Sequence, residues 1–366
     1  MTALLASFAF AMFVANPALG RISDKLGRRP VLLLSLGVGK VAHLWFAVSN
    51  DIMQMFAART IAGLATGNIG VIQSIIADRT SPQDRARTMG FLGAAIGAGF
   101  VTGPALGGLL SGIGSGPVHQ TPFLIAAAFS ALSFILAIRL KETGTLSRSV
   151  VTQGVFSEYV KTVLSGQIGW FAASFFCLNL AFAQVEVSYV LLVRDLLGFG
   201  ARQTGWLFIY IGVLIIIVQG GLISRAVLRF GEMKTIIAGV ALLASGQLLT
   251  VALAFGDALG LVIMVGPILL STTLVCVGFA FTNPTLTASA SKAASARNMG
   301  GSLGFIQGCG SIGQVLGLVS AGPFNAFGGS VASFGFGTAV TCCLLVFILM
   351  MLSRQHRQQK MADGVC

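Results

Sequence analysis

The sequence predicts an all-α polytopic membrane protein with two pseudo-symmetric helical bundles, and three observations support this prediction. The composition is 55% hydrophobic and only 9% charged, with a mean hydropathy of +0.89, whereas soluble domains carry about 25% charged residues. Apolar stretches near the roughly 20 residues that a membrane-spanning helix needs recur along the chain. The basic residues fall mainly in alternate connections between these stretches. We therefore expect about eleven membrane spans and no separate soluble domain.

The apolar stretches define the predicted spans. They are residues 2–19, 30–49, 52–76, 88–113, 122–140, 168–192, 204–223, 235–255, 259–283, 299–323 and 331–352. The first stretch lacks the basic n-region of a secretory signal peptide and leads directly into a basic segment, so we expect it to be a true span.

The longest connection, residues 141–167, divides five spans from six. The sequence GRISD leaves the first span at residues 20–24, and GLISR leaves the seventh at residues 221–225. Such paired repeats are typical of secondary transporters. We predict an N-terminal bundle at 1–140, a cytoplasmic linker at 141–167, a C-terminal bundle at 168–353 and a basic cytoplasmic tail at 354–366.

The net charge of +12 comes from 23 basic and 11 acidic residues. Most basic residues lie in one set of alternate connections, and the positive-inside rule makes that side cytoplasmic. This places the C-terminus inside and the N-terminus of the chain outside a plasma (inner) membrane. Because the charge follows topology, we expect the lipid bilayer as a partner, no nucleic acid, and a monomer. The six cysteines show no C-x-x-C spacing and are expected to be free thiols, without a metal site.

A glycine-rich basic segment follows the first span, and residues 20–30 read GRISDKLGRRP. Its glycines permit a tight turn, and its aspartate and arginines can join helix ends by charge-assisted hydrogen bonds. The segment resembles the signature loop of the major facilitator superfamily, and in particular of the drug:proton antiporters that include the tetracycline efflux proteins. The resemblance implies a latch for the outward-facing state that comprises Gly20, Asp24, Gly27, Arg28, Arg29 and Asp78.

In that latch, the resemblance implies that Asp24 faces a helix end of the second bundle and that Arg28 pairs with Asp78. The second copy of the segment has Arg225 where the aspartate would be, so only the first copy is expected to act as a latch. The alternative is that the arginines serve only as positive-inside anchors.

The fourth span carries glycines at fixed intervals beside one proline. They are Gly90, Gly99, Gly103, Pro104, Gly107 and Gly108. Small residues at such intervals let helices approach closely, and a proline bends a helix. The pattern resembles the antiporter signature of the superfamily, which implies export rather than import and a smooth face that rocks against its neighbours. Ordinary helix packing is the alternative.

Charged side chains inside predicted spans are costly in hydrocarbon and usually face a cavity or a partner. Arg59 lies in a segment that resembles the superfamily's fourth-helix signature, which implies a role in proton coupling. Glu186 and His43 are candidate proton carriers, and Lys40 lies near His43 at i, i+3 spacing. The structural alternatives are an arginine bonded to carbonyls, a glutamate that reaches interfacial water and a packed histidine.

Neutral polar residues on other spans are candidates to line a substrate cavity. They are Asn68, Gln73, Asn179, Gln184, Tyr210, Asn283 and Gln307. Gln184 lies in a stretch similar to the seventh helix of the tetracycline exporters. Because so few charges are present, the cavity suits a mainly apolar or weakly basic molecule. An interhelical hydrogen bond is the alternative for each residue.

The chain departs from the tetracycline exporters in two places. They carry an acidic residue midway along the helix after the signature loop, where this sequence has Ala42. The tetracycline–metal chelate is therefore not the substrate that we expect. The family's first helix has no counterpart, so either the true start lies upstream or the chain is a shortened member with altered coupling.

Taken together, the sequence predicts a secondary active transporter that exports small, largely lipophilic molecules by alternating access and proton antiport. Its expected partners are protons and a small-molecule substrate. The sequence contains no G-x-S-x-G, H-E-x-x-H or P-loop motif, so we expect neither an enzyme nor a cofactor. The alternatives are a metabolite facilitator or importer and a non-transporting receptor or scaffold.

Overall fold

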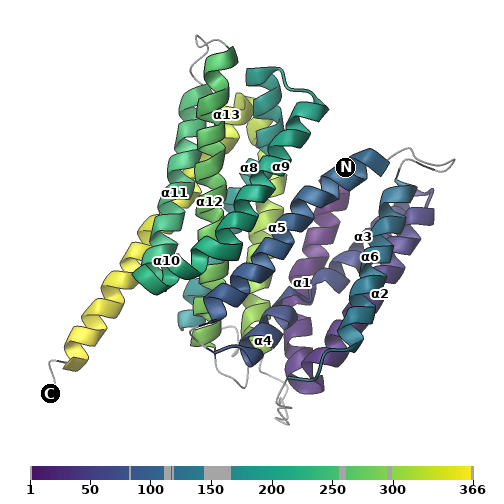
Figure 1. Cartoon of the computed structure of the whole chain (residues 1–366), viewed down its shortest axis with the longest axis horizontal. Coiled ribbons are helices and arrows are strands. Elements are labelled where there is room, and N and C mark those ends of the chain that lie inside the picture. The colour runs from purple at the N-terminus through teal and green to yellow at the C-terminus, as the bar shows by residue number, and fades with distance from the viewer. Residues whose placement is uncertain are drawn as a thin grey trace.

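The structure is a computed structural model that describes residues 2–81, 84–110, 117, 119–143, 166–254, 261–294 and 299–363. The regular elements of the described residues are helices (Figure 1). They are α1 (Thr2–Leu26), α2 (Arg28–Val48), α3 (Ile52–Thr66), α4 (Ile69–Arg79), α5 (Arg85–Leu110), α6 (Gln120–Ile138), α8 (Gln167–Leu197), α9 (Ala201–Ile217), the π-helix η1 (Val218–Leu222), α10 (Ile223–Phe230), α11 (Glu232–Ala254), α12 (Leu261–Ala293) and α13 (Met299–Asp363).

The all-helical membrane fold that the sequence predicts is confirmed. Each predicted span overlaps a helix, and eight helical segments among the described residues are long and apolar enough to cross a membrane. One of these segments, Gly301–Ser353, belongs to α13, which contains two predicted spans because it continues through a break. At that break Gly328 and Gly329 leave the helical conformation, and Gly329 has a φ of 61°.

Two predicted spans are interrupted. The span at 52–76 is divided into α3 and α4 at Gly67 and Asn68, where a Cβ on Gly67 would lie 2.5 Å from the Cβ of Ala15 on α1. The span at 204–223 passes through η1 before it continues as α10. Single π-turns inside α-helices often occur at functional sites.

The helices form two groups that meet along an extensive contact, which we call the seam. Helices α1, α2, α3 and α6 pack against one another, and α8 packs against α13 and α11 against α12. Across the seam, α1 and α4 contact α13, and α5 contacts α9, η1, α10 and α12. Figure 1 shows α5 running obliquely between the two groups.

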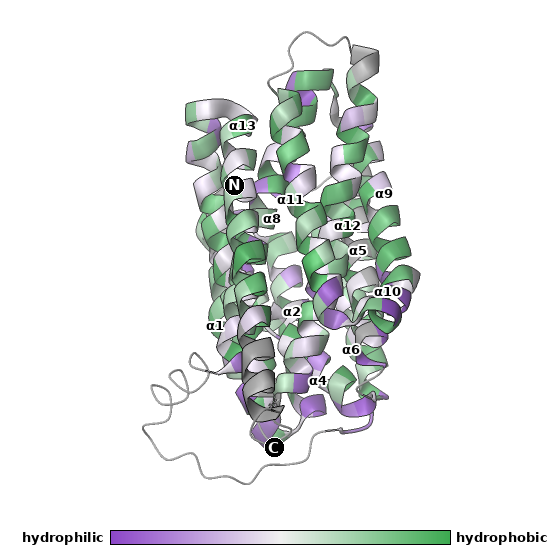
Figure 2. Cartoon of the chain, turned by 90° about the vertical axis from the view of Figure 1, so that its left-hand side faces the viewer, coloured by the Kyte–Doolittle hydropathy of each residue, from purple (hydrophilic) through white to green (hydrophobic). Residues whose placement is uncertain are grey.

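Hydropathy along the molecule agrees with a protein embedded in a membrane. Hydrophobic residues dominate the middle of the helices, and hydrophilic residues gather toward the end where α4, α10 and the C-terminus lie (Figure 2). On α6, Phe129, Ile135 and Leu136 are 57%, 56% and 56% exposed, as expected of side chains that contact lipid. Among the described residues, five cysteines are free thiols, as predicted; Cys366 lies outside the described residues.

Candidate functional site: a polar seam between two helix groups

The signature segment at residues 20–30 is mostly helical rather than a loop. Helix α1 continues to Leu26, so Gly20 lies inside a helix and the expectation that it forms part of a tight turn is wrong. Gly27 alone makes the turn, with a φ of 100°, and its N–H donates to the carbonyl of Ser23 at 3.1 Å. Pro30 falls in the first turn of α2, where a missing N–H costs little.

Arg28 forms the centre of a charged cluster at this end of the molecule. It is only 3% exposed, and its Nε donates to Asp78 Oδ2 on α4 at 3.2 Å while its Nη1 donates to Asp24 Oδ1 on α1 at 2.5 Å. Asp24 Oδ2 in turn accepts a hydrogen bond from the N–H of Gly301, at the start of α13, at 2.7 Å. A carboxylate is favourable at a helix N-terminus because of the helix dipole. The cluster therefore joins four helices and includes the two contacts that the resemblance implied.

Sequence reasoning missed Glu142, which follows α6. Its carboxylate accepts hydrogen bonds from the backbone N–H groups of Arg28 at 2.8 Å and Arg29 at 3.1 Å, and so caps the start of α2. Arg29 also donates from Nη2 to the carbonyl of Ile138 at 2.8 Å. A Cβ on Gly27 would lie 2.6 Å from Glu142 Oε2, so a larger residue would have to displace this carboxylate in addition to adopting the φ of 100°. One sequence feature could have indicated this role: Glu142 is an acidic residue at the start of a connection in which basic residues outnumber acidic ones.

A second tie across the seam was also missed. Arg85, at the start of α5, donates to the carbonyl of Ser291 on α12 at 3.3 Å and to that of Ala77 on α4 at 3.2 Å. Nearby, a Cβ on Gly70 would lie 2.8 Å from the Cα of Gly304. The seam is thus closely packed at the end that carries the charged cluster.

The glycine pattern on α5 divides into a packed part and an open part. A Cβ on Gly90 would lie 2.6 Å from the carbonyl oxygen of Gln219 in η1, and Gly93 meets the side chain of the same glutamine. At Gly99 and Gly103, both exposed, a Cβ would have no atom within 4 Å. Close packing in this structure therefore requires small residues at the start of α5 and not at these two positions. Pro104, Gly107 and Gly108 lie in the last turns of the same helix.

Arg59 lies in a cage of aromatic rings within the first helix group. Its guanidinium carbon is 5.6 Å from the ring of Phe8, 5.4 Å from Phe46 and 5.1 Å from Phe123. These rings belong to α1, α2 and α6. Among the described residues, these cation–π contacts surround Arg59, and no hydrogen bond from Arg59 to a carbonyl is found.

His43 and Lys40 also contact α6, so they share a side of α2. The His43 ring centre is 6.1 Å from that of Phe123, and Lys40 Nζ is 5.8 Å from the ring centre of Phe134. None of the ion pairs formed by the described residues includes Lys40 or Arg59. Arg59, His43 and Lys40 therefore lie together inside the first group, away from the seam.

Glu186 lies apart from these three residues, on α8. It is half-buried, and its Oε2 accepts a hydrogen bond from Gln314 Nε2 on α13 at 3.4 Å. Among the described residues, the hydrogen-bond partner of Glu186 is therefore polar and uncharged.

Most of the predicted cavity residues are instead bonded within one helix group. Gln184 is fully buried, donates to the Gly317 carbonyl at 2.9 Å and to Ser320 Oγ at 2.8 Å, and accepts from Ser333 at 2.7 Å. The prediction that Gln184 lines a cavity is therefore wrong in this state, because its amide is already satisfied by packing partners.

The interhelical alternative also describes Asn68 and Tyr210. Asn68 is 7% exposed and donates to Ser35 Oγ on α2 at 2.7 Å. The Tyr210 hydroxyl lies 2.6 Å from Thr273 Oγ1. Asn179 donates to the carbonyl of Phe175 in its own helix at 2.9 Å, and Asn283 is half-buried on α12.

Gln73 and Gln307 differ, because they meet across the seam. Gln307 Nε2 on α13 donates to Gln73 Oε1 on α4 at 3.1 Å. One helix turn further along α13, Ser311 Oγ accepts from Asn16 Nδ2 on α1 at 3.2 Å. Neutral polar side chains therefore line part of the contact between the two groups.

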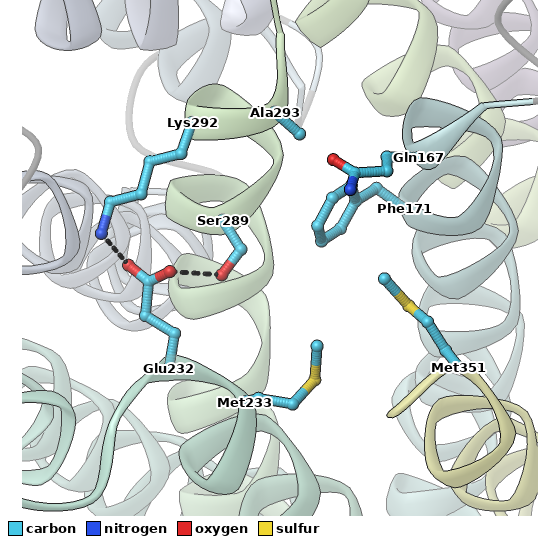
Figure 3. A pocket seen from close by; sticks show the side chains of 8 residues that line it. All are labelled: Gln167, Phe171, Glu232, Met233, Ser289, Lys292, Ala293 and Met351. Carbon is cyan, nitrogen blue, oxygen red and sulfur yellow. Dashed lines mark hydrogen bonds and ion pairs between the residues drawn. The ribbon is translucent and has the colours of Figure 1, made fainter. Parts of the chain in front are cut away.

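A pocket of about 340 Å³ lies within the second group, between α8, α11, α12 and α13 (Figure 3). On one wall Glu232 accepts from Ser289 Oγ at 2.8 Å and from Lys292 Nζ at 2.7 Å, while Phe171 and Met351 face it from the other side. Its lining contains none of the predicted cavity residues. The Glu232 carboxylate is already bonded at both oxygens.

Comparison with known proteins identifies the family. The sequence profile described as the Major Facilitator Superfamily matches residues 1–318. The chain belongs to this superfamily. The resemblance of the signature segment is thereby confirmed, and the chain is a multi-pass membrane protein of a family of transporters rather than enzymes.

Its relatives include resistance proteins. The chain is 33% identical over 244 residues to the class G tetracycline resistance protein of Vibrio anguillarum, which covers 65% of this chain and 61% of the relative. It is 29% identical over 327 residues to multidrug resistance protein 1 of Bacillus subtilis, over 87% of this chain and 79% of the relative. The matched region thus spans about three fifths of the length of the tetracycline resistance protein.

Solved structures show the same fold. The human organic anion transporter MFSD10 (TETRAN) superposes with a TM-score of 0.81 at 24% identity, over 94% of this chain and 83% of that one. A bacterial homologue of the iron transporter ferroportin in an outward-facing state superposes with a TM-score of 0.74 at 14% identity, over 96% and 89%. At these identities the likeness concerns the fold alone.

Proposed function

We propose that this protein exports small, largely lipophilic molecules by alternating access, driven by proton antiport. The observation that carries the proposal is the charged cluster in which Asp24 bonds to the start of α13 while Arg28 holds Asp24 and Asp78. A tie of this kind across the seam can be released and remade in a transport cycle. The drug-resistance names of the relatives support a drug-like substrate.

In the proposed topology, the two helix groups are bundles at residues 1–140 and 168–353, joined by a cytoplasmic linker at 141–167 and followed by a basic tail at 354–366. The basic end of the molecule faces the cytoplasm, which leaves the N-terminus of the chain outside. The unit of transport is a monomer in the plasma (inner) membrane. The packing of the seam at the basic end supports a state closed toward the cytoplasm in this topology.

In the proposed cycle, the latch opens when Asp24 leaves the N–H of Gly301. Arg28 still neutralises Asp24 and Asp78, so no buried carboxylate is left unpaired as the groups separate. Release of Arg85 from the Ser291 carbonyl completes the opening on the α12 side. Gly90 lets α5 pivot against η1 at close range.

For proton coupling, we assign the proton-carrying role to Glu186, because it is a half-buried carboxylate inside a span and close to α13. Arg59 and Lys40 supply positive charge in the first group that influences the site at longer range, and His43 beside them is the second candidate proton carrier. Replacement of Arg59 by Gln is expected to abolish coupled transport and to leave membrane insertion intact.

The proposal is tested by flux in proteoliposomes that contain the full chain under an imposed pH gradient. Neutral drugs and lipophilic cations are both offered, and Asp24→Asn is compared with Asp195→Asn, a control whose exposed carboxylate pairs with the neighbouring Arg194. Gradient-dependent efflux that Asp24→Asn slows, and the control does not, is the expected result. Downhill flux that ignores the pH gradient would favour a facilitator, and no flux over the panel would favour a receptor or scaffold.

A further inference from the structure

Helix α10 differs from the membrane-spanning helices around it. Its eight residues, Ile223–Phe230, follow η1 at the basic end of the molecule and lie beside α11 and α12 (Figure 1). Ile223 is buried and anchors the helix, whereas Leu228 and Phe230 are 80% and 57% exposed. Basic residues alternate with these exposed apolar ones. A helix with this mixture of side chains is typical of the boundary between lipid and water.

A groove of about 370 Å³ lies between α10, α11 and α12, and we call it the α10 groove. Its polar lining residues are Lys234 and Thr235, and the Thr235 hydroxyl already donates to the carbonyl of Gly231 at 2.7 Å. The rest of the described lining is apolar and offers contact to hydrocarbon. These apolar residues are Ala226, Phe230, Ala238, Leu242 and Phe281.

Lys234 gives one end of the α10 groove a positive charge. Its side chain is exposed, and none of the ion pairs formed by the described residues includes it. Lys234, Ala238 and Leu242 are spaced four residues apart, so they follow one side of α11 over about 12 Å. The groove therefore runs from a cation at the end of a membrane span toward the apolar middle of that span.

Two arginines lie beside the α10 wall of this groove. Arg225 precedes the lining residue Ala226, and Arg229, one helix turn later, precedes the lining residue Phe230. The guanidinium carbon of Arg229 is 5.5 Å from the ring centre of Phe230. Neither arginine belongs to an ion pair of the described residues. Both therefore add positive charge on the side of the groove opposite α11.

The neighbouring acidic residue does not pair with these cations. Glu232 is the one acidic residue in the sequence between Asp195 and Asp257. Its carboxylate accepts from Ser289 and Lys292 in the pocket of Figure 3. The α10 groove thus combines a positively charged rim with an apolar interior.

We propose that the α10 groove binds one anionic phospholipid. Lys234 binds the phosphate, Arg225 and Arg229 add positive potential beside it, and an acyl chain lies along Ala238 and Leu242. Basic residues near a membrane surface favour anionic headgroups, and an apolar lining favours a hydrocarbon chain. If these cations served only as positive-inside anchors, they would need no groove beside them. The inference goes beyond the proposed function, because it holds for either direction of transport and for any substrate.

Native mass spectrometry of the purified full chain tests the inference. The protein is given equal amounts of dioleoyl phosphatidylglycerol and dioleoyl phosphatidylcholine, which share their acyl chains and differ in net charge. The ratio of the two lipid adducts measures the preference for the anionic lipid. The unmodified protein is expected to retain one phosphatidylglycerol in preference to phosphatidylcholine. Glycerol phosphate, which carries the charge without a chain, should not displace it.

Two substitutions separate the charge from the apolar groove. Lys234→Gln is expected to reduce the preference about fivefold, as for the loss of one basic residue near a membrane surface, while Lys234→Arg keeps it. Ala238→Trp fills the groove and is expected to abolish the retained phosphatidylglycerol, although all three basic residues remain.

Each substitution has a matched control. Lys141→Gln removes an exposed lysine after α6, in the first helix group, and Leu248→Trp adds the same ring at an exposed position of α11 outside the groove. Neither control should change the lipid ratio. Circular dichroism establishes that every variant is folded.

The outcomes distinguish this inference from the proposed function. Equal retention of the two lipids, or a preference that survives both Lys234→Gln and Ala238→Trp, would overturn the lipid site. Displacement of the lipid by glycerol phosphate would assign the basic rim to a free anion and would overturn it as well. Selective retention of phosphatidylglycerol without any gradient-driven flux would support the lipid site and refute the exporter, and the reverse result would refute the lipid site alone.

Discussion

At the scale of single residues, Glu142 and Gly27 form a matched pair. The carboxylate of Glu142 bonds to the N–H groups of Arg28 and Arg29, and in this position its Oε2 lies where a Cβ on residue 27 would meet it. The φ of 100° at Gly27 also lies in a region that other residues rarely adopt. With glycine at position 27, the Glu142 carboxylate caps the start of α2. The Arg28 side chain then lies within bonding distance of Asp24 and Asp78.

Gly27→Ala is therefore expected to be costly. Backbone strain alone should destabilise the folded protein by about 1–3 kcal/mol, and the new methyl group displaces Glu142. Thermal unfolding in detergent, monitored by circular dichroism, measures the change. Gly198→Ala is the control, since Gly198 has a φ of 63° and open space around the added Cβ. Equal losses for the two variants would mean that contact with Glu142 contributes nothing.

Arg28→Ala is expected to destabilise the protein by about 3–5 kcal/mol, because removal of one partner leaves buried charge uncompensated. The side chains of Asp24 and Asp78 are only 11% and 20% exposed, so water compensates little. Combining Arg28→Ala with Asp78→Asn should recover part of the loss. Simple additivity of the two losses in the double variant would contradict a direct interaction between these residues.

Residue roles differed in how far the sequence could predict them. The Arg28–Asp78 contact was implied by the resemblance of residues 20–30 to the signature loop of the superfamily, and the structure contains it. Gln184 was misassigned because a polar residue in a span has the same sequence pattern whether it bonds to Ser333 or faces a cavity. Glu142 was missed because 114 residues separate it from Arg28, and no periodic pattern reports such a contact.

At the scale of helices, hydropathy predicted where helices occur but not where they break. Spans are apolar whether straight or interrupted, so the Gly67–Asn68 break between α3 and α4 and the π-turn η1 left no periodic signal. The end of α1 was placed too early because polar residues at 20–26 remain helical beyond the apolar stretch. Helix ends in such segments depend on local bonds, here from Gly27 to Ser23.

The contact between α5 and η1 yields a prediction about the glycine pattern. Gly90→Val is expected to reduce transport about tenfold or more, because its side chain would meet the Gln219 backbone and Ile223. Gly103→Val, at a position with open space around the added side chain, is expected to retain transport within about twofold. Initial rates of efflux from proteoliposomes measure both.

The Gly103 variant also distinguishes two interpretations of the pattern. A strong loss at Gly103 would show that α5 packs along its whole length when the seam rearranges. Unchanged transport by Gly90→Val, with normal insertion, would mean that the close approach to η1 plays no part in the cycle.

At the scale of the whole molecule, the ties across the seam are concentrated at the basic end. Asp24 with Gly301, Arg85 with Ser291 and Gly70 with Gly304 all join the two groups there. Two of these ties are hydrogen bonds to backbone atoms, which do not depend on the partner's side chain. A rearrangement of the groups must break both bonds together.

Asp24→Asn combined with Arg85→Ala is expected to open the basic end. Spin labels attached at Lys25 and Lys234, two exposed positions in different groups, report the distance between the groups in a background without native cysteines. The double variant should populate a longer distance than the unmodified protein in the same detergent. An identical distance distribution would show that other contacts hold the seam, and that the latch assignment is wrong.

The cap that Glu142 places on α2 also bears on how the chain is made. Residues 28 and 29 leave the ribosome long before residue 142, so the first turn of α2 must wait for its carboxylate until all of α6 has been synthesised. The cap then ties the end of the first helix group back to its beginning. The cap on α2 is therefore completed only when the ribosome has entered the connection that leads to α8, after Arg28, Asp24 and Asp78 have all been synthesised.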